Sequence, residues 1–176
     1  KEFNKVKPYT YFIKRKSEKL YNSQKRCVVG RTGATSKNND FAEHVFVAST
    51  HDYVIFFTSS GKCFWRKVHE LPESSLTARG RALTNILELS ENEKVRSYIS
   101  LKNFDQDKFL IMTTKSGIIK KTKLEEYSRP RSNGIIAINL KSNDELISVR
   151  TSSGSDQILI STHNGQAIRF NENDVR

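Results

Sequence analysis

The sequence predicts an all-β fold made of repeated four-stranded blades, as in a propeller. First, the motif Thr-x-x-Gly occurs at Thr58–Gly61, Thr114–Gly117 and Thr162–Gly165, each time after a short apolar strand. Second, a strand that turns basic follows each of these glycines. Third, no segment has the apolar spacing of a long amphipathic helix. Together these observations indicate one hairpin unit that recurs along the chain.

The clearest unit runs from Val45 to Gly80. Its segment Tyr53-Val-Ile-Phe-Phe57 is too short for a helix and rich in β-branched and aromatic residues, so it predicts a buried strand. A turn at Gly61 leads into a second strand, Lys62 to Val68, which ends before Pro72. This strand carries Phe64 and Trp65, which we expect mainly to pack in the core; stacking on nucleic-acid bases is the alternative.

A second repeated element places an asparagine five residues after a glycine. It occurs at Gly80–Asn85 and at Gly134–Asn139. With the turns, it divides the chain into a partial blade (1–41), two blades (42–103 and 104–154) and a second partial blade (155–176). Because one blade cannot bury both of its faces, the blades must stack into a single β domain. The chain starts at Lys1 and ends in a strand-like segment, so we expect a fragment of a longer protein.

The charge is strongly positive and unevenly distributed. The net charge is +11, and residues 1–40 contain eleven Lys and Arg against three acids. A polyanion such as nucleic acid is the expected partner, and a basic surface that only aids solubility is the alternative. No apolar run is longer than about five residues, so we expect no membrane span and no signal peptide. Cys27 and Cys63 lie in unlike contexts and suggest neither a disulfide nor a zinc site, which fits a reducing compartment.

Motifs for catalysis and metal binding are not found. The four histidines, His44, His51, His69 and His163, lack the spacing of metal ligands. The sequence contains no Gly-x-Ser-x-Gly nucleophile motif and no nucleotide-binding P-loop. We therefore expect no catalytic residue, no metal and no cofactor in this chain.

The candidate functional residues are basic and recur from unit to unit. A repeat array displays equivalent positions along one edge, so such charges would form a stripe that matches the phosphates of duplex DNA. For each single residue the alternative is a solvated strand end. The strand candidates are Lys14, Arg15, Lys16, Arg66, Lys67, Lys120, Lys121, Lys123 and Arg169, which we expect at equivalent places, and the loop candidates are Lys25, Arg26, Arg31, Arg79, Arg81, Arg129 and Arg131.

Several stretches of the chain also resemble a known family. The run from Phe41 to Thr58, then Gly61, Trp65 and Glu70-Leu-Pro-Glu73, resembles the carboxy-terminal domain of the DNA gyrase A subunit, as do Gly165–Phe170 and Asp174–Arg176. The resemblance implies a β-pinwheel, a propeller-like disc whose blades exchange strands and whose basic rim wraps double-stranded DNA. It also implies that the catalytic tyrosine lies in another domain, so this chain alone is not an enzyme.

One motif departs from that family. The family's box has the pattern Gln-Arg/Lys-Arg-Gly-Gly-Lys/Arg-Gly, and this chain has Gln24-Lys25-Arg26-Cys27-Val28-Val29-Gly30. Gln24, Lys25, Arg26 and Gly30 match, whereas two glycines and one cation are lost; Arg31 can restore the charge one position later. The lost glycines restrict the backbone of this loop. The altered box, and a first blade that lacks its turn glycine, weaken the expectation of strong wrapping more than that of DNA binding.

The leading hypothesis is therefore a non-catalytic DNA-binding and DNA-wrapping domain. By resemblance its partners are duplex DNA, the gyrase B subunit, plus the remainder of the gyrase A subunit; ATP and Mg²⁺ are used only by the holoenzyme, and no membrane is involved. The resemblance implies a bacterial cytoplasm with nucleoid association, or a plastid-type organelle. The competing hypothesis is a propeller-like protein-interaction module whose basic surface does not wrap DNA.

Overall fold

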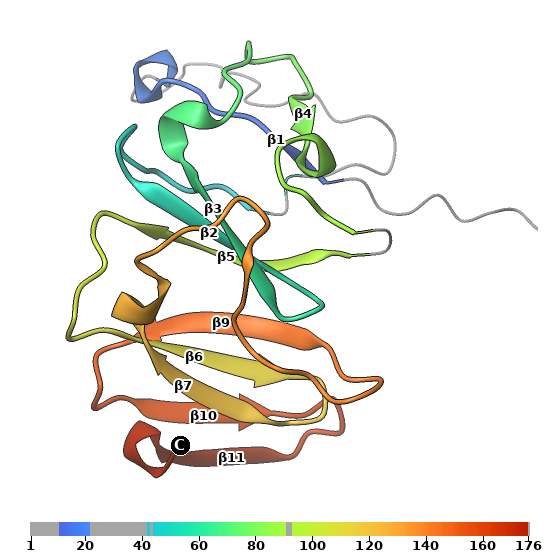
Figure 1. Cartoon of the computed structure of the whole chain (residues 1–176), viewed down its shortest axis with the longest axis vertical. Coiled ribbons are helices and arrows are strands. Elements are labelled where there is room, and N and C mark those ends of the chain that lie inside the picture. The colour runs from blue at the N-terminus through green and yellow to red at the C-terminus, as the bar shows by residue number, and fades with distance from the viewer. Residues whose placement is uncertain (1–10, 22–41, 43, 91–92, 176) are drawn as a thin grey trace, which may run out of the picture.

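The computed structural model describes residues 11–21, 42, 44–90 and 93–175, whose strands form sheets stacked one upon another (Figure 1). The first sheet pairs β1 (Phe12–Ile13) with β4 (Arg81–Ala82). The second has the order β5 (Val95–Leu101), β2 (Tyr53–Thr58), β3 (Lys62–Lys67), β8 (Ile135–Ile136). The third has the order β7 (Ile119–Lys123), β6 (Phe109–Thr114), β9 (Leu146–Ser152), and the last pairs β10 (Gln157–Ser161) with β11 (Ala167–Asn171). No α-helix occurs among these residues, which confirms the predicted all-β class.

Each predicted hairpin is present. The hairpin strands are β2 (Tyr53–Thr58) with β3 (Lys62–Lys67), β6 (Phe109–Thr114) with β7 (Ile119–Lys123), and β10 (Gln157–Ser161) with β11 (Ala167–Asn171). A short 3-10 turn follows each second strand: η2 (Val68–Glu70), η4 (Leu124–Tyr127) and η5 (Glu172–Asp174). The turn η1 (Glu18–Leu20) follows β1 at a distance of a few residues, and η3 (Leu83–Asn85) follows β4. Hairpin and turn together form the repeating unit that the sequence predicted.

The threonine of the Thr-x-x-Gly motif holds the hairpin turn closed. The N–H of each motif glycine donates to the threonine carbonyl, at 3.0 Å for Gly61 and Gly117 and 3.1 Å for Gly165. In all three turns the threonine hydroxyl also accepts the N–H of the residue four positions later, at 3.2 to 3.3 Å. The glycines have φ values of about +80°, which other residues rarely adopt. The motif recurs because threonine and glycine are both needed to form this turn.

The second repeated glycine marks a place where units exchange strands. β4 follows Gly80 and pairs with β1 of the preceding unit, and β8 (Ile135–Ile136) follows Gly134 and pairs with β3. A Cβ on Gly80 would lie 2.5 Å from the carbonyl oxygen of Ile13, and one on Gly134 would lie 2.8 Å from that of Cys63. Only glycine allows this close approach. This strand exchange crosses the unit boundary expected between residues 103 and 104. β8 lies in the later unit by sequence, but it completes the sheet of the earlier unit.

In the second and third sheets, the strand that pairs with the outer side of the hairpin comes directly after an exchanged strand in the chain. β5 (Val95–Leu101) pairs with β2, and β9 (Leu146–Ser152) pairs with β6. Both pairings shift register near their ends, at Phe57/Thr58 and at Thr113/Thr114. The two strands contact each other, so they join the second and third sheets.

The core lies between the sheets as two apolar clusters. Trp65, Ile55 and Phe57 point toward the third sheet and pack in a cluster that includes Met112 and Leu124. Phe64, on the opposite face of β3, belongs to a second cluster with Val68, Leu83 and Leu87. Phe64 and Trp65 are only 1% and 4% exposed. The prediction that both rings pack is therefore confirmed, and neither ring is accessible for stacking on a base.

Candidate nucleic-acid interface

The three consecutive cations after β1 bind the backbone of the loop formed by residues 71–80. The Lys14 ammonium donates to the carbonyls of Leu76 and Ala78 at 3.2 and 2.6 Å, and the Lys16 ammonium donates to that of Leu76 at 2.9 Å. The Arg15 guanidinium donates to the carbonyl of Leu71 at 3.4 Å and pairs with Glu73 at 3.0 Å. Burial, followed by the neighbouring Lys16 ammonium, lowers the pKa of Lys14. These charges hold a loop in place within the protein.

Two further cations of the predicted stripe bind backbone carbonyls in the same way. The Arg66 guanidinium donates twice to the carbonyl of Ile86, at 3.1 and 2.7 Å, and once to that of Trp65 at 2.9 Å. The Lys120 ammonium donates to the carbonyl of Ala137 at 2.9 Å. Ile86 and Ala137 both follow an exchanged strand. Arg66 lies in β3 and Lys120 in β7, so each cation ties the segment after the exchanged strand back to the hairpin of its own unit, not to the sheet that receives the strand.

Lys121 is held between two units. Its ammonium forms an ion pair with Glu172 at 3.2 Å, with side-chain exposures of 13% and 0%, and lies 4.4 Å from the centre of the Phe109 ring. We did not expect Glu172 at this position from the sequence. The signal that could have revealed it is an acid at the place where Val68 and Leu124 are apolar in the other units.

The expectation that the strand cations occupy equivalent places is only partly correct. Strand pairing sets Trp65, Lys121 and Arg169 opposite Ile55, Ile111 and Leu159, so these three residues are equivalent. By the same register Lys67 corresponds to Lys123, whereas Arg66 corresponds to Thr122 and Lys120 to Phe64. The strands repeat, but only some of the cations coincide, because packing between units takes the other positions.

The remaining predicted cations are on the surface. Lys67 is half-buried, with its ammonium 5.2 Å from the centre of the Tyr53 ring, and the Arg79 guanidinium stacks 3.9 Å from the Phe12 ring. Six side chains, hereafter the exposed cations, face solvent; they are Arg79, Arg81, Lys123, Arg129, Arg131 and Arg169.

Four of the exposed cations lie in or beside two equivalent loops. Residues 71–80 and 128–134 each connect a 3-10 turn to the exchanged strand of the same unit. Arg79 and Arg81 flank Gly80 in the first unit, and Arg129 and Arg131 lie in the second loop. These four residues are hereafter called the rim arginines. Equivalent loops of a repeat lie along one edge of the stack, so the rim arginines can contact a single extended anion.

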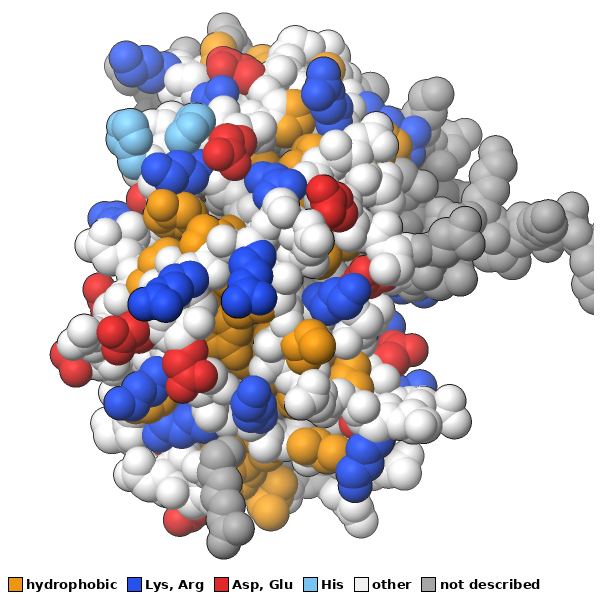
Figure 2. Space-filling model, viewed as in Figure 1, with side chains coloured by type: hydrophobic (Ala, Val, Ile, Leu, Met, Phe, Trp, Pro, Cys, Tyr) orange, Lys and Arg blue, Asp and Glu red, His pale blue; other side chains and the backbone are white. Residues whose placement is uncertain are grey.

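The charge on the surface extends over the whole stack. Figure 2 shows Lys and Arg side chains on every layer of the face in view, with Asp and Glu side chains among them. An extended basic surface suits a long, regularly charged ligand better than a small molecule.

The predicted box residues Gln24, Lys25, Arg26 and Gly30, together with Arg31, lie outside the described residues. In chain order the box follows η1 as the loop 71–80 follows η2. Its DNA-binding role stays a prediction.

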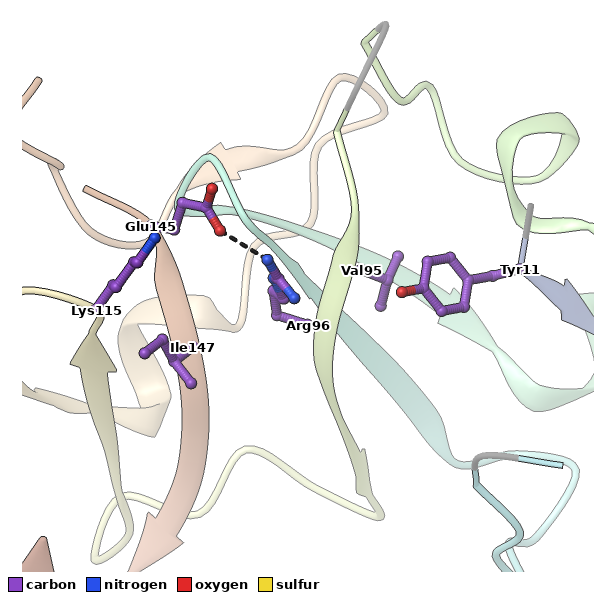
Figure 3. Close-up of a pocket in the computed structure, with 6 residues that line it drawn as sticks. All are labelled: Tyr11, Val95, Arg96, Lys115, Glu145 and Ile147. Carbon is purple, nitrogen blue, oxygen red and sulfur yellow. Dashed lines mark hydrogen bonds and ion pairs between the residues drawn. The ribbon is translucent and has the colours of Figure 1, made fainter. Parts of the chain in front are cut away.

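Two shallow hollows lie on the surface that the described residues form: one of about 420 Å³ at the loop 71–80, lined by residues that include Arg79 and Arg81, and one beside β5 and β9. The second has a volume of about 350 Å³, and Arg96, Glu145, Lys115, Ile147 and Tyr11 are among its lining residues (Figure 3). Arg96 of β5 forms an ion pair with Glu145 at 2.6 Å and thereby holds the pKa of that carboxyl below its usual value. Arg96 is thus paired within the protein, and the Arg96–Glu145 ion pair joins the second and third sheets beside this hollow.

Neither a metal site nor a membrane span is present in the described part of the chain. Within the described ranges, no three His, Cys, Asp or Glu side chains gather as metal ligands. In the same residues no helix is long and apolar enough to span a bilayer.

Comparison with known families decides the assignment. The family described as DNA gyrase C-terminal domain, beta-propeller, matches residues 52–100, 108–153 and 156–176, which together make up more than half of the chain. The chain belongs to this family. The gyrase C-terminal resemblance predicted from the sequence is therefore confirmed, including the propeller-like fold.

Curated relatives and solved structures agree with the assignment. The DNA gyrase A subunit of Clostridium acetobutylicum is 47% identical over 165 residues, covering 94% of this chain and 20% of the relative. That of Haemophilus influenzae is 46% identical over 156 residues, covering 89% of this chain and 18% of the relative. A crystal structure of the C-terminal domain of DNA topoisomerase IV matches with a TM-score of 0.67 and 30% identity, over 72% of this chain and 40% of that one.

A structure of the DNA gyrase A C-terminal domain has the same fold, with a TM-score of 0.62 at 22% identity, over 94% of this chain and 53% of that one. The chain spans about a fifth of the length of these two curated relatives, both of which are bacterial gyrase A subunits. It thus corresponds to part of the C-terminal domain of such a protein.

Proposed function

We propose that this chain is a DNA-binding and DNA-wrapping surface of a gyrase A subunit. The observation that carries the proposal is the placement of the rim arginines in equivalent loops of two successive units. Contacts at a regular spacing along one edge bind the sugar-phosphate backbone and fix the path of the duplex without reading its sequence. The chain bends DNA, and catalysis takes place elsewhere in the holoenzyme.

The energetics of bending require several contacts at once. Smooth bending of a 20–30 bp segment costs about 1–6 kcal/mol. A few phosphate contacts in each unit offset this cost when units are arranged side by side. In the holoenzyme, with the rest of the A subunit, the B subunit, ATP and Mg²⁺, a wrap of fixed hand supports negative supercoiling. The corresponding location is the bacterial cytoplasm, at the nucleoid.

Salt dependence of duplex binding tests the proposal. Each phosphate contact contributes about −0.9 to the slope of log affinity against log salt. If the six exposed cations all bind phosphates, affinity falls roughly 10³-fold between about 50 and 200 mM salt. Fluorescence anisotropy with a labelled duplex of mixed sequence measures this fall.

A second duplex of unrelated sequence is the control, and it should give the same slope within error. An affinity that changes less than about threefold over this salt range would contradict the proposal. That result would favour the protein-interaction module.

A further inference from the structure

The position occupied by Glu172 is equivalent to two apolar positions in the earlier units. The N–H of Glu172 donates to the carbonyl of the residue before β10, Asp156, at 3.0 Å. The N–H of Leu124 donates to Lys108 at 2.8 Å and that of Val68 to Asp52 at 3.0 Å, and each acceptor likewise precedes the first strand of its unit. Leu124 and Val68 are buried in apolar clusters, and Glu172 is completely buried as a carboxylate.

The residue that pairs with Glu172 also differs from its equivalent in the earlier unit. A joint is here the contact between one sheet and the next along the stack. Lys121 is equivalent to Trp65, because they lie opposite Ile111 and Ile55. Trp65 and Leu124 belong to the apolar cluster between the second and third sheets. At the next joint, between the third sheet and β10–β11, the same two positions hold the Lys121–Glu172 ion pair.

The site is shaped around this pair, but it does not satisfy the carboxylate fully. Gly154 closes one side, where an added Cβ would lie 3.0 Å from the Phe109 ring and 3.6 Å from Oε1 of Glu172. Oε1 accepts from Lys121, whereas the buried Oε2 has no hydrogen-bond partner in the described part of the chain. A buried ion pair gains little over an apolar pair, because its attraction is offset by lost hydration, and an unsatisfied oxygen reduces the gain further.

We propose that the joint between the third sheet and the β10–β11 unit is an ionic hinge, at which the stack opens more readily than at the apolar joint before it. Opening returns both charges to water, where hydration compensates for the lost attraction. Opening the preceding joint would expose Trp65 and Leu124, and nothing compensates for that exposure. The β10–β11 unit therefore changes its angle to the stack while the second and third sheets move as one body.

Hydrogen exchange of the whole chain, without DNA, tests the hinge through three states of the pair. In Lys121→Met the buried carboxylate loses its partner, and we expect the β10–β11 amides to exchange at least about tenfold faster. In Lys121→Met with Glu172→Leu the joint becomes apolar like the preceding one. We then expect these amides to exchange at least about tenfold more slowly than in the wild type.

The matched control is Lys108→Met, which removes an exposed ion pair with Asp105 and should change exchange less than about threefold. The amides of β2 and β3 serve as an internal reference that all variants leave unchanged.

Should the double variant be misfolded, Glu172→Gln alone, which keeps the shape and removes the charge, is expected to accelerate β10–β11 exchange. The hinge is refuted if Lys121→Met and Glu172→Gln leave exchange unchanged, or if a folded double variant exchanges as fast as Lys121→Met. Because no DNA is present, either outcome is independent of the proposed wrapping.

Discussion

Replacing the four rim arginines Arg79, Arg81, Arg129 and Arg131 with alanine lowers duplex affinity by about 10²–10³-fold at about 100 mM salt. The reason is counterion release: each lost phosphate contact removes about 0.9 from the salt slope, so the slope becomes shallower by three to four. Fluorescence anisotropy across a salt series measures both quantities. All four side chains are exposed, so the fold should be retained, which circular dichroism checks.

The matched control compares two positions at each end of the same unit. Lys115 and Lys141 are exposed and lie near the β6–β7 turn, at the opposite end of the strands from the loop with Arg129 and Arg131. The Arg129→Ala, Arg131→Ala variant should reduce the salt slope by about two, and the Lys115→Ala, Lys141→Ala variant by much less. Equal losses from both pairs would show that net charge alone, rather than an oriented rim, determines binding.

Removing Arg66 and Lys120, two of the cations that bind backbone carbonyls, should lower stability rather than duplex affinity. We expect Arg66→Met combined with Lys120→Met to lower the free energy of unfolding by about 2–5 kcal/mol while changing duplex affinity only a few-fold. Arg66 donates three hydrogen bonds to backbone carbonyls and Lys120 donates one, and each loss leaves part-buried carbonyls without their charged donor. The two sites lie in different sheets, so their effects should add.

Urea denaturation followed by tryptophan fluorescence gives the change, because Trp65 is buried beside Arg66. Lys123→Met is the control, since Lys123 is exposed on the same strand as Lys120 and should cost at most about 0.5 kcal/mol. A double variant as stable as the wild type, with affinity reduced tenfold, would place Arg66 and Lys120 at the DNA instead.

The hairpins and the order of the units could be predicted from the sequence. The Thr-x-x-Gly turns require particular residues for local reasons: a hydroxyl that accepts a backbone N–H and a glycine at positive φ. Such local requirements are visible in a single chain. The second glycine, at Gly80 and Gly134, was visible as a repeat for the same reason, although its role at the strand exchange became clear only from the approach of Ile13 and Cys63.

The role of each cation could not be predicted in the same way. Lys120 and Lys123 are three residues apart on one short strand, yet the first donates to a carbonyl of a later segment and the second faces solvent. Which of the two lysines binds a carbonyl depends on where the exchanged strand lies, and this is a property of the tertiary structure. Charge and spacing alone therefore could not separate the cations that bind carbonyls within the protein from those that face solvent, and the DNA contacts of both groups stay a prediction.

The strands β5 and β9 were not individually predicted either. Their residues have no simple alternation, because both strands shift register against their partners and lie against each other. Val95, Arg96 and Ile147 are consequently neither fully buried nor arranged on one clean face. Tertiary contact again overrides the local pattern.

The most direct test of DNA wrapping is the linking number of nicked circular DNA that is ligated in the presence of the chain. We expect the topoisomer distribution to shift in one direction, by an amount that grows with protein concentration, and we expect the variant without the rim arginines to show no shift. A variant with Cys27→Gly, Val28→Gly and Val29→Lys, which rebuilds the box, should enlarge the shift in the same direction. Salt-sensitive binding with no shift, in the wild type and in the rebuilt variant alike, would contradict the claim that this surface wraps DNA with a fixed hand.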